Sequence, residues 1–211
     1  MKRIAVDVWH TEHMTAAGEI PFGSAVKYSA AGTVVVAVDG ANTRGFIGIA
    51  EDDIVEKTQP GCYSTYDPVP VIVAGIVYLP VVGGGTDVAA GDLLKLANDS
   101  GLMVRESATT EAVSTTCARA LEDAEVSNYT TAMSTATAGA KTATVTSTAY
   151  FLAGDMVYLQ GATDATATDS EVVQIATVDS TTQVTFKTAL KFSYSSQNMK
   201  KLVQVKCLLR G

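Results

Sequence analysis

His10 and His13 are the only histidines of the 211-residue chain, and Glu12 lies between them. Imidazole and carboxylate groups bind zinc in proteins and act as general bases. The spacing is not that of H-E-x-x-H, in which two histidines share one face of a helix, and the segment follows a strand-like run. Because no third ligand is defined, we interpret these residues as part of a surface loop. The sequence predicts no metal and no other cofactor.

The sequence also offers few residues that could carry out nucleophilic catalysis. A serine or cysteine nucleophile needs a histidine base, and only the segment just described offers one. Gly83-Gly84-Gly85-Thr86 is glycine-rich, but no Gly-Lys-Ser/Thr follows and no helix is expected there, so we interpret it as a flexible connection between strands. The carboxylates of Glu51-Asp52-Asp53 and Glu122-Asp123 are typical of solvated strand ends. The sequence predicts no enzyme, and a hydrolase built on the two histidines is the remaining catalytic alternative.

Composition narrows the possible partners. The chain is 47% hydrophobic and 18% charged, with a formal net charge of −7, so we expect a sizeable core and no basic surface for nucleic acid. The longest apolar run, Val69–Val82, contains two prolines and is shorter than the roughly 20 residues of a membrane-spanning helix. We therefore expect a soluble protein that retains its N-terminus and binds neither nucleic acid nor a membrane.

Three cysteines are far apart in the chain and odd in number: Cys62, Cys117 and Cys207. A disulfide scaffold would show more cysteines at closer spacing. The sequence therefore predicts partly buried thiols in a reducing compartment.

Short β-strands should position all of these side chains, because no segment has a sustained helical period. Alternation in Ile4–Trp9 predicts a strand, followed by a polar connection at His10–Met14. The run Val69–Pro80 is rich in β-branched residues and is expected to be the most buried strand, with Gly75 at a bulge or bend and the prolines at its ends. Further strands are expected at Val26–Tyr28, Thr33–Val38, Phe46–Ala50, Leu93–Leu96, Leu102–Val104 and Thr115–Leu121.

One hairpin pattern occurs twice. Ile20–Val36 and Asp87–Val104 align at an offset of 68 residues, and Leu152–Leu159 repeats the first part of the pattern. Each copy has an apolar lead-in, a glycine and a short strand. We interpret the glycine and aspartate residues as turn residues of a repeated structural unit rather than as ligands.

A second module follows residue 128, where threonine, alanine and serine become frequent. Strand periodicity persists there, which predicts a four-stranded module with a hairpin turn at Asp179–Thr182. The strand Lys201–Leu209 is expected to rejoin the first domain. The sequence thus predicts an all-β fold with a core domain of residues 1–128 and 197–211. Residues 129–196 are expected to form an inserted small β-barrel or β-sandwich that faces outward. The four strands are Ala143–Thr146, Met156–Leu159, Glu171–Val178 and Gln183–Phe186.

Without a catalytic constellation, such a chain is expected to act through its surfaces. Aromatic residues are enriched at interface hot spots, and an unpaired strand edge favours pairing with another chain. The candidate interface residues are Ile4, Val6, Val8, Trp9, Tyr63 and Tyr66.

Three short motifs occur in a characteristic order: Gly48-Ile49-Ala50-Glu51-Asp52, then Gly75-Ile76-Val77-Tyr78-Leu79-Pro80, then Ala89-Ala90-Gly91-Asp92. With their surroundings, from Gly18 to Asp123, they resemble the capsid cement, or decoration, proteins of tailed bacterial and archaeal viruses. The resemblance also takes in the closing strand Lys201–Leu209. The second module departs from the minimal pattern of that family and resembles strand modules of other virus structural proteins.

The resemblance implies a β-tulip or barrel-like core domain and a homotrimer that binds the major capsid protein. It further implies a position on the outer capsid surface of the virion, after assembly in the host cytoplasm. The alternative function is a receptor- or glycan-binding module of the virion, with residues 129–196 as the recognition domain.

Overall fold

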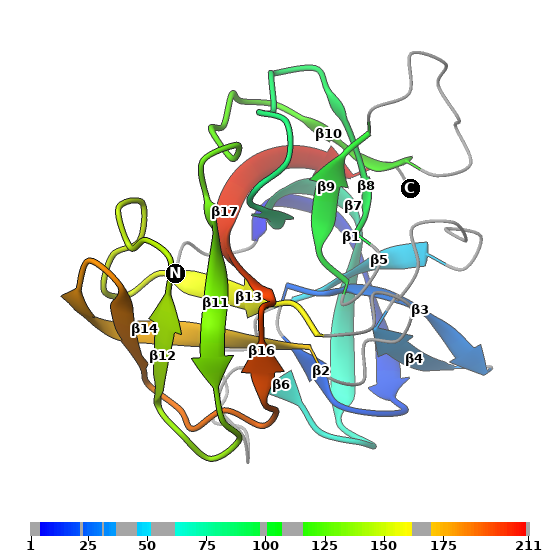
Figure 1. Ribbon diagram of the computed structural model, residues 1–211. Coiled ribbons are helices and arrows are strands. Elements are labelled where there is room, and N and C mark those ends of the chain that lie inside the picture. The colour runs from blue at the N-terminus through cyan, green and yellow to red at the C-terminus, as the bar shows by residue number, and fades with distance from the viewer. Residues whose placement is uncertain are drawn as a thin grey trace. The chain divides into compact units, whose positions relative to one another are not determined.

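The computed structural model describes residues 5–21, 23–30, 32–36, 46–51, 62–97, 101–106, 116–161 and 170–209. Within these ranges every regular element is a β-strand, which confirms the predicted all-β class (Figure 1). The strands are β1 (Ala5–Ala16), β2 (Ile20–Pro21), β3 (Ala25–Ala30), β4 (Thr33–Val36), β5 (Phe46–Ala50), β6 (Cys62–Tyr63), β7 (Pro68–Val82), β8 (Leu93–Leu96), β9 (Met103–Arg105), β10 (Thr116–Ala120), β11 (Thr130–Ala136), β12 (Thr142–Val145), β13 (Met156–Leu159), β14 (Glu171–Ser180), β15 (Gln183–Phe186), β16 (Tyr194–Ser195) and β17 (Asn198–Leu209).

The chain divides into two compact units. Unit 1 contains residues 1–81, 88–124 and 204–211, and unit 2 contains residues 82–87 and 125–203. The second unit thus begins and ends a few residues outside the predicted 129–196, and it also takes in the glycine-rich segment after β7. Strand β17 contributes its first half to unit 2 and its second half to unit 1.

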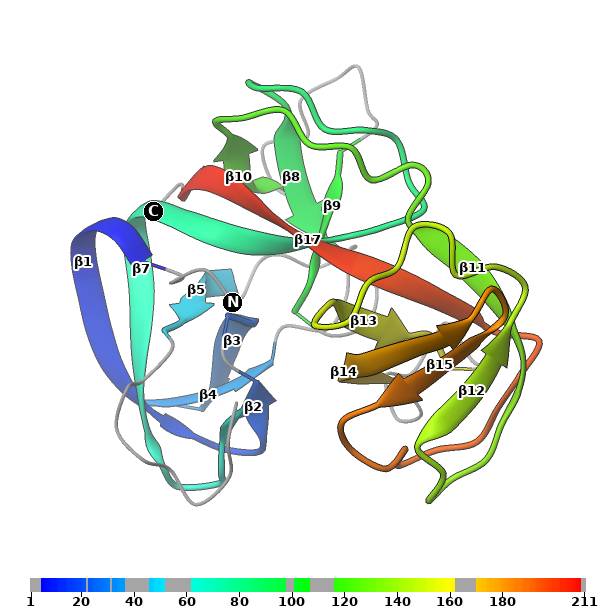
Figure 2. The same cartoon turned by 90° about the vertical axis from the view of Figure 1, so that its left-hand side faces the viewer.

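Five strands of unit 1 wrap around a common core. The pairings run from β1 to β4, β3, β5 and β7, and β7 pairs in turn with β1, so the arrangement is barrel-like. Figure 2 shows β1 and β7 side by side, both strongly curved. Burial of apolar side chains between these strands supplies the main stabilisation of the unit. The core contains Ala16, Ile20, Val26, Val34, Ala50, Tyr63, Val69 and Val71.

The polar segment His10–Met14 is not a loop, and the sequence interpretation was wrong here. Strand β1 continues through it to Ala16 and stays paired with β7 as far as Thr15 opposite Pro68. Register shifts between Val8 and Thr11 interrupt regular pairing. A strand whose outer face meets solvent accepts polar residues, so the pairing with β7 outweighs the lost hydrophobic alternation.

Strand β7 is confirmed as a long, largely buried strand, but its prolines are not at its ends. It runs from Pro68 to Val82, so Pro70 and Pro80 both lie inside it. The carbonyl oxygen of Pro70 still accepts a hydrogen bond, from the Glu51 N–H at 2.9 Å. At Gly75, which has a φ of 142°, the register between β1 and β7 shifts, as the expected bulge or bend requires.

The remaining strands of unit 1 include the second copy of the hairpin pattern. Strands β8 and β9 pair antiparallel, as do β3 and β4 of the first copy. Val26 pairs with Val36 in the first copy, whereas the equivalent Leu94 pairs with Arg105, one residue beyond the position that the offset of 68 predicts. The repeat is therefore structural, and its second loop is one residue longer. Strand β10 pairs with β8 and with the second half of β17.

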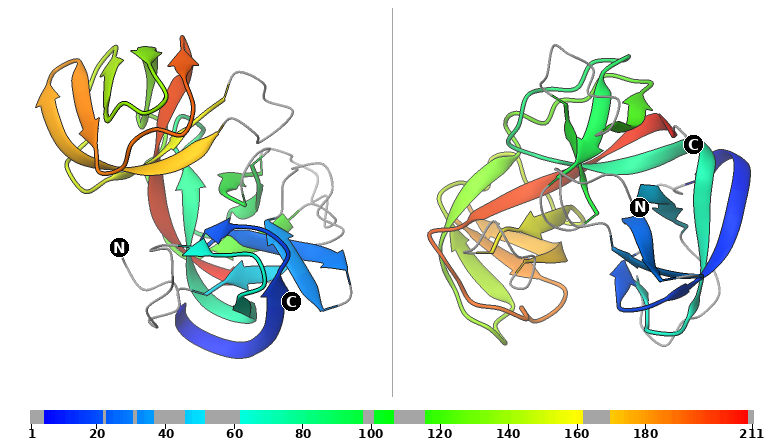
Figure 3. Two further views of the ribbon diagram at one scale, coloured as in Figure 1. Left: turned by 90° about the horizontal axis from the view of Figure 1, so that it is seen from below. Right: turned by 90° about the vertical axis from the view of Figure 1, so that its right-hand side faces the viewer.

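Unit 2 is also barrel-like. Its pairings run from β17 to β13, β14, β15, β12 and β11, and β11 pairs again with β17. Figure 3 shows these strands curving around a common centre. The predicted strands and the turn after Ser180 are present, but β11 and β16 were not predicted. β11 reads TTAMSTA, in which Met133 is the only large apolar side chain, so its hydrophobic alternation is weak. The core of the unit contains Met133, Val145, Phe151, Val157, Leu159, Ile175, Val184, Phe186, Leu190, Tyr194 and Met199.

The glycine-rich segment after β7 is closely packed rather than a flexible connection. The Gly83 N–H donates to the Lys201 carbonyl at 2.8 Å, and the Gly84 N–H donates to the Val126 carbonyl at 2.7 Å. A Cβ on Gly83 would collide with the backbone of Tyr129. The first two glycines are therefore required by the close approach of three chain segments, which a sequence pattern does not reveal.

Candidate functional site

A four-residue turn at Ala89–Asp92 leads directly into strand β8 of unit 1. The Asp92 N–H donates to the Ala89 carbonyl at 3.0 Å, and the Asp92 carboxylate accepts the Ala89 N–H at 2.8 Å. The turn is then bound to β10, since the Gly91 N–H donates to the Ala120 carbonyl and the Ala120 N–H donates to the Asp92 carbonyl, both at 2.8 Å. Gly91 has a φ of 97°, as the third residue of such a turn requires. We call this turn with its two bonds to a neighbouring strand a clasp turn.

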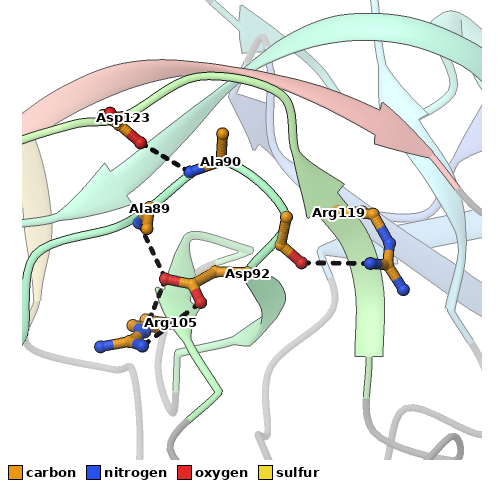
Figure 4. Close-up of polar contacts among 7 residues, drawn as sticks. Ala89, Ala90, Asp92, Arg105, Arg119 and Asp123 are labelled. Atoms are coloured by element: carbon orange, nitrogen blue, oxygen red, sulfur yellow. Dashed lines mark hydrogen bonds and ion pairs between the residues drawn. The ribbon is translucent and has the colours of Figure 1, made fainter.

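Charged side chains reinforce this clasp turn (Figure 4). Arg105 Nε lies 2.7 Å from Asp92 Oδ2, and Arg119 Nη1 donates to the Gly91 carbonyl at 3.3 Å. The Ala90 N–H donates to Asp123 Oδ1 at 2.7 Å. These groups hold the turn in place, so the Gly and Asp residues of the A-A-G-D motif have the structural role that the sequence predicted for them.

A second clasp turn lies in unit 2 at Leu152–Asp155. The Gly154 N–H donates to the Ile175 carbonyl at 2.8 Å, and the Ile175 N–H donates to the Asp155 carbonyl at 2.9 Å. Asp155 accepts the Leu152 N–H at 2.8 Å and lies 2.8 Å from Lys201 Nζ. The predicted third copy of the sequence pattern is thus the same local structure in a different unit.

A third clasp turn, at Pro21–Ser24, shows the same bonds with one substitution. The Gly23 N–H donates to the Ala50 carbonyl at 2.8 Å, and the Ala50 N–H donates to the Ser24 carbonyl at 2.9 Å. The first residue of this turn is a proline, which has no N–H for an aspartate to accept. The last residue of this turn is a serine, because an aspartate carboxylate there would find no N–H group on the first residue.

The fourth clasp turn, at Ser64–Asp67, was not recognised in the sequence because it contains no glycine. The Tyr66 N–H donates to the Ala16 carbonyl at 2.7 Å, and the Ala16 N–H donates to the Asp67 carbonyl at 2.9 Å. Asp67 Oδ2 accepts the Ser64 N–H at 2.8 Å. Tyr66 occupies the position that glycine holds in the other three copies, with a φ of 74°. The final aspartate, shared with A-A-G-D and L-A-G-D, is the signal that would have identified this turn.

The candidate interface residues lie in different environments. Tyr66 is 84% exposed, whereas Tyr63 is fully buried and its hydroxyl donates to the Glu51 carbonyl at 2.6 Å. Tyr63 therefore belongs to the core of unit 1 and is not presented to a partner. Val8 is half-buried in β1. Ile4 lies outside the described residues, as do the side chains of Val6 and Trp9, whose backbones belong to β1.

Unit 2 has an exposed apolar patch of its own. Tyr150 is 50% exposed and Leu152, the first residue of the second clasp turn, is 67% exposed. The Tyr150 ring packs edge-on against Tyr129 with centroids 6.3 Å apart, and Lys201 Nζ lies 4.9 Å from the centre of the Tyr129 ring. The Asp155 carboxylate forms an ion pair with Lys201. We call these five residues the Tyr150 patch.

Two of the three thiols are poor nucleophiles at neutral pH. Cys117 and Cys207 are buried, and burial raises the pKa of each thiol to about 12, so both stay protonated at neutral pH. None of the three cysteines forms a disulfide. In the part of the chain that the structure describes, no three His, Cys, Asp or Glu side chains gather as metal ligands, and no helix is long and apolar enough to span a membrane.

His10 and Glu12 share one face of β1, with His10 Nε2 3.4 Å from Glu12 Oε1. His13 follows Glu12 directly in the strand and therefore lies on the opposite face. The two histidines are thus not brought together as a pair of ligands.

The exposed carboxylates Asp87 and Asp179 of unit 2 predict an acid-sensitive fold. Hydroxyl donors from Thr185 at 2.6 Å and Thr177 at 2.7 Å lower the pKa of Asp179. The N–H groups of Val126 and Ser127, both at 2.8 Å, lower the pKa of Asp87. A lowered pKa in the folded state stabilises the fold above the unfolded pKa of about 3.9, and this stabilisation is lost as the pH falls through the folded pKa.

We therefore expect Asp179→Asn to lower the melting temperature at pH 7 and to have a much smaller effect at pH 2. Scanning calorimetry across this range measures the difference. Thr185→Val, which removes the stronger donor, should reproduce part of it. A deficit that stays constant from pH 7 to pH 2 would contradict the assignment.

Residues 5–145 match the family model of the structural cement protein (E217 gp24/Pam3 gp6). The match spans more than half of the chain, from β1 through β12. No curated protein matches the chain. The chain therefore belongs to the structural cement protein family of phages.

Proposed function

We propose that this protein binds the outer surface of the major capsid protein lattice as a homotrimer and stabilises the phage head. Membership of the cement family is the observation that carries this proposal, because it gives the chain a structural role at the capsid of the virion. A symmetric trimer would engage several lattice subunits at once, and repeated weak contacts yield a high combined affinity. The assembly step would take place in the host cytoplasm.

Unit 1 is the part that we assign to capsid binding. The family match begins in β1 and covers the two long segments of unit 1 up to residue 124. The match also includes residues 82–87 and 125–145 of unit 2, whereas residues 146–203, the larger part of that unit, lie beyond it. A feature shared across a family is expected in the shared part of the chain, so unit 2 is assigned the outward-facing role.

Binding to shells of the cognate major capsid protein tests the proposal. Purified protein is mixed with preformed shells and sedimented, and an electron-microscopy reconstruction locates the bound density. Multi-angle light scattering of the protein alone measures its mass. We expect saturable binding, density on the outside of the shell, a trimer in solution and a shell that resists higher temperatures. A monomer at high concentration together with no binding to shells would contradict the proposal.

The Tyr150 patch favours a second candidate function, the binding of a cell-surface glycan by unit 2. Sugars present apolar C–H faces that pack on aromatic rings and hydroxyl groups that bond to charged side chains. The patch offers an exposed ring, an exposed leucine and an adjacent Asp155–Lys201 ion pair. A glycan array probed with the whole protein tests this function. Signals that Tyr150→Ala abolishes and Tyr28→Ala preserves would support it, and an array without signals would contradict it.

A further inference from the structure

The clasp turn at Ser64–Asp67 has a residue that its backbone does not favour. In the three other copies the positive φ belongs to a glycine, with values of 78°, 97° and 95° at Gly23, Gly91 and Gly154. Tyr66 adopts 74° in the same hydrogen-bonded setting. This conformation is uncommon for a bulky residue with a Cβ, and glycine adopts it without a steric penalty.

The tyrosine side chain adds little stability to the fold that would offset its unfavourable backbone conformation. A large side chain stabilises a fold mainly through the apolar surface that it removes from water. With an exposed fraction of 84%, Tyr66 is the most exposed large apolar residue that the structure describes. A costly backbone conformation without compensating burial indicates that the side chain is retained for a contact outside this chain.

The surroundings of Tyr66 are those of an interface anchor. Four neighbouring exposed residues are small or uncharged, namely Ala17, Gly32, Thr65 and Pro68, and the charged residues nearby are the half-buried Asp67 and the exposed Glu19. The backbone brings them together, since the Thr15 N–H donates to the Gly32 carbonyl at 3.0 Å and Ala16 bonds to both Tyr66 and Asp67. A protruding aromatic side chain beside small residues is a form that interface hot spots take.

We propose that Tyr66 is an anchor residue that inserts its ring into a pocket on the outer surface of the major capsid protein. The proposal rests on the proposed cement function and names the side chain that carries it. The clasp turn fixes the backbone at both of its bonds to Ala16, so the backbone that carries the ring has little conformational freedom to lose on binding. The phenol hydroxyl is available to bond at the base of such a pocket.

Two substitutions separate the ring from the backbone conformation. Tyr66→Ala and Tyr66→Gly both remove the ring, but only alanine keeps the unfavourable φ. We expect both variants to bind preformed capsid shells about tenfold more weakly or worse, measured by co-sedimentation titration. The glycine variant should melt about 2–4 °C above the alanine variant. It should also melt no lower than the wild type, so weaker binding would accompany an undamaged fold.

Tyr28→Ala is the matched control, because Tyr28 is 49% exposed in β3 of the same unit and has no positive φ. It should leave shell binding unchanged. Unaltered binding by Tyr66→Gly, while the wild type binds, would overturn this inference and leave the cement function intact. Loss of the solution trimer in Tyr66→Gly would assign the ring to a second copy of the chain and also overturn it. Failure of the wild type to bind shells would overturn the proposed function and this inference together.

Discussion

Gly48→Ala is expected to destabilise the protein by about 3 kcal/mol, because the added Cβ would collide with the backbone of β7. The new atom would meet the carbonyl oxygen of Ile72 and would lie 2.8 Å from Val71 Cγ1. Backbone atoms in a paired strand cannot move aside as the end of a flexible side chain can. Relief would require separation of β5 from β7, whose pairing at Ile49 and Ala50 holds the barrel-like core of unit 1 together.

Urea unfolding followed by circular dichroism measures this effect as a shift of the midpoint. Gly18→Ala is the control, since a Cβ there meets no atom within 4 Å and the residue has no positive φ. We expect the control to stay within about 0.5 kcal/mol of the wild type. Equal midpoints for the two variants would show that β5 and β7 are not in close contact at Gly48. The result also bears on the motif Gly48-Ile49-Ala50-Glu51-Asp52, because it would explain why its first residue is glycine.

Gly83→Ala is expected to have a comparably large effect, about 2–4 kcal/mol, at the beginning of unit 2. A Cβ on Gly83 would collide with the Tyr129 carbonyl and would lie 2.8 Å from the Lys201 carbonyl. Both partners are backbone atoms, and Gly83 itself donates a hydrogen bond to Lys201. The substitution therefore disturbs the place where three segments of unit 2 meet.

The neighbouring glycines provide a graded series. Gly84 has a φ of 84°, and a Cβ there would lie 2.8 Å from Thr130 Cβ, so Gly84→Ala should cost an intermediate amount. A Cβ on Gly85 meets no atom within 4 Å, so Gly85→Ala should be neutral. Thermal unfolding of the three variants gives the order directly. Three neutral substitutions would restore the interpretation of this segment as a flexible connection.

Strand positions followed from local pattern where the pattern was strong. Phe46–Ala50, Met156–Leu159 and Gln183–Phe186 have the predicted bounds, because short apolar or alternating runs between turn residues leave little choice of register or length. β1 extended seven residues beyond its prediction, and β11 was missed altogether. In both cases polar or small residues pair with a neighbouring strand, and this pairing depends on residues far away in the chain.

The candidate interface residues could likewise be predicted only in part from the sequence. Tyr66 was a candidate interface residue from the sequence, but so was Tyr63, which is buried with its hydroxyl bonded to Glu51. The two lie three residues apart in similar surroundings, so only the tertiary structure separates core from surface here. The family resemblance, based on three short motifs in order, is confirmed by the family model.

By itself, the sequence determined the all-β class, the family and the repeated turn, because glycine and aspartate at fixed spacing specify a local backbone conformation. The tertiary structure alone decided which glycines are packed against other chain segments and where the fourth clasp turn lies. That turn has the same hydrogen bonds as the others, yet its third residue is a tyrosine, and a bond from Tyr66 to a strand some fifty residues earlier leaves no local trace in the sequence. The physical reason is that hydrogen bonds to a distant strand can fix a backbone conformation that the residue itself does not favour.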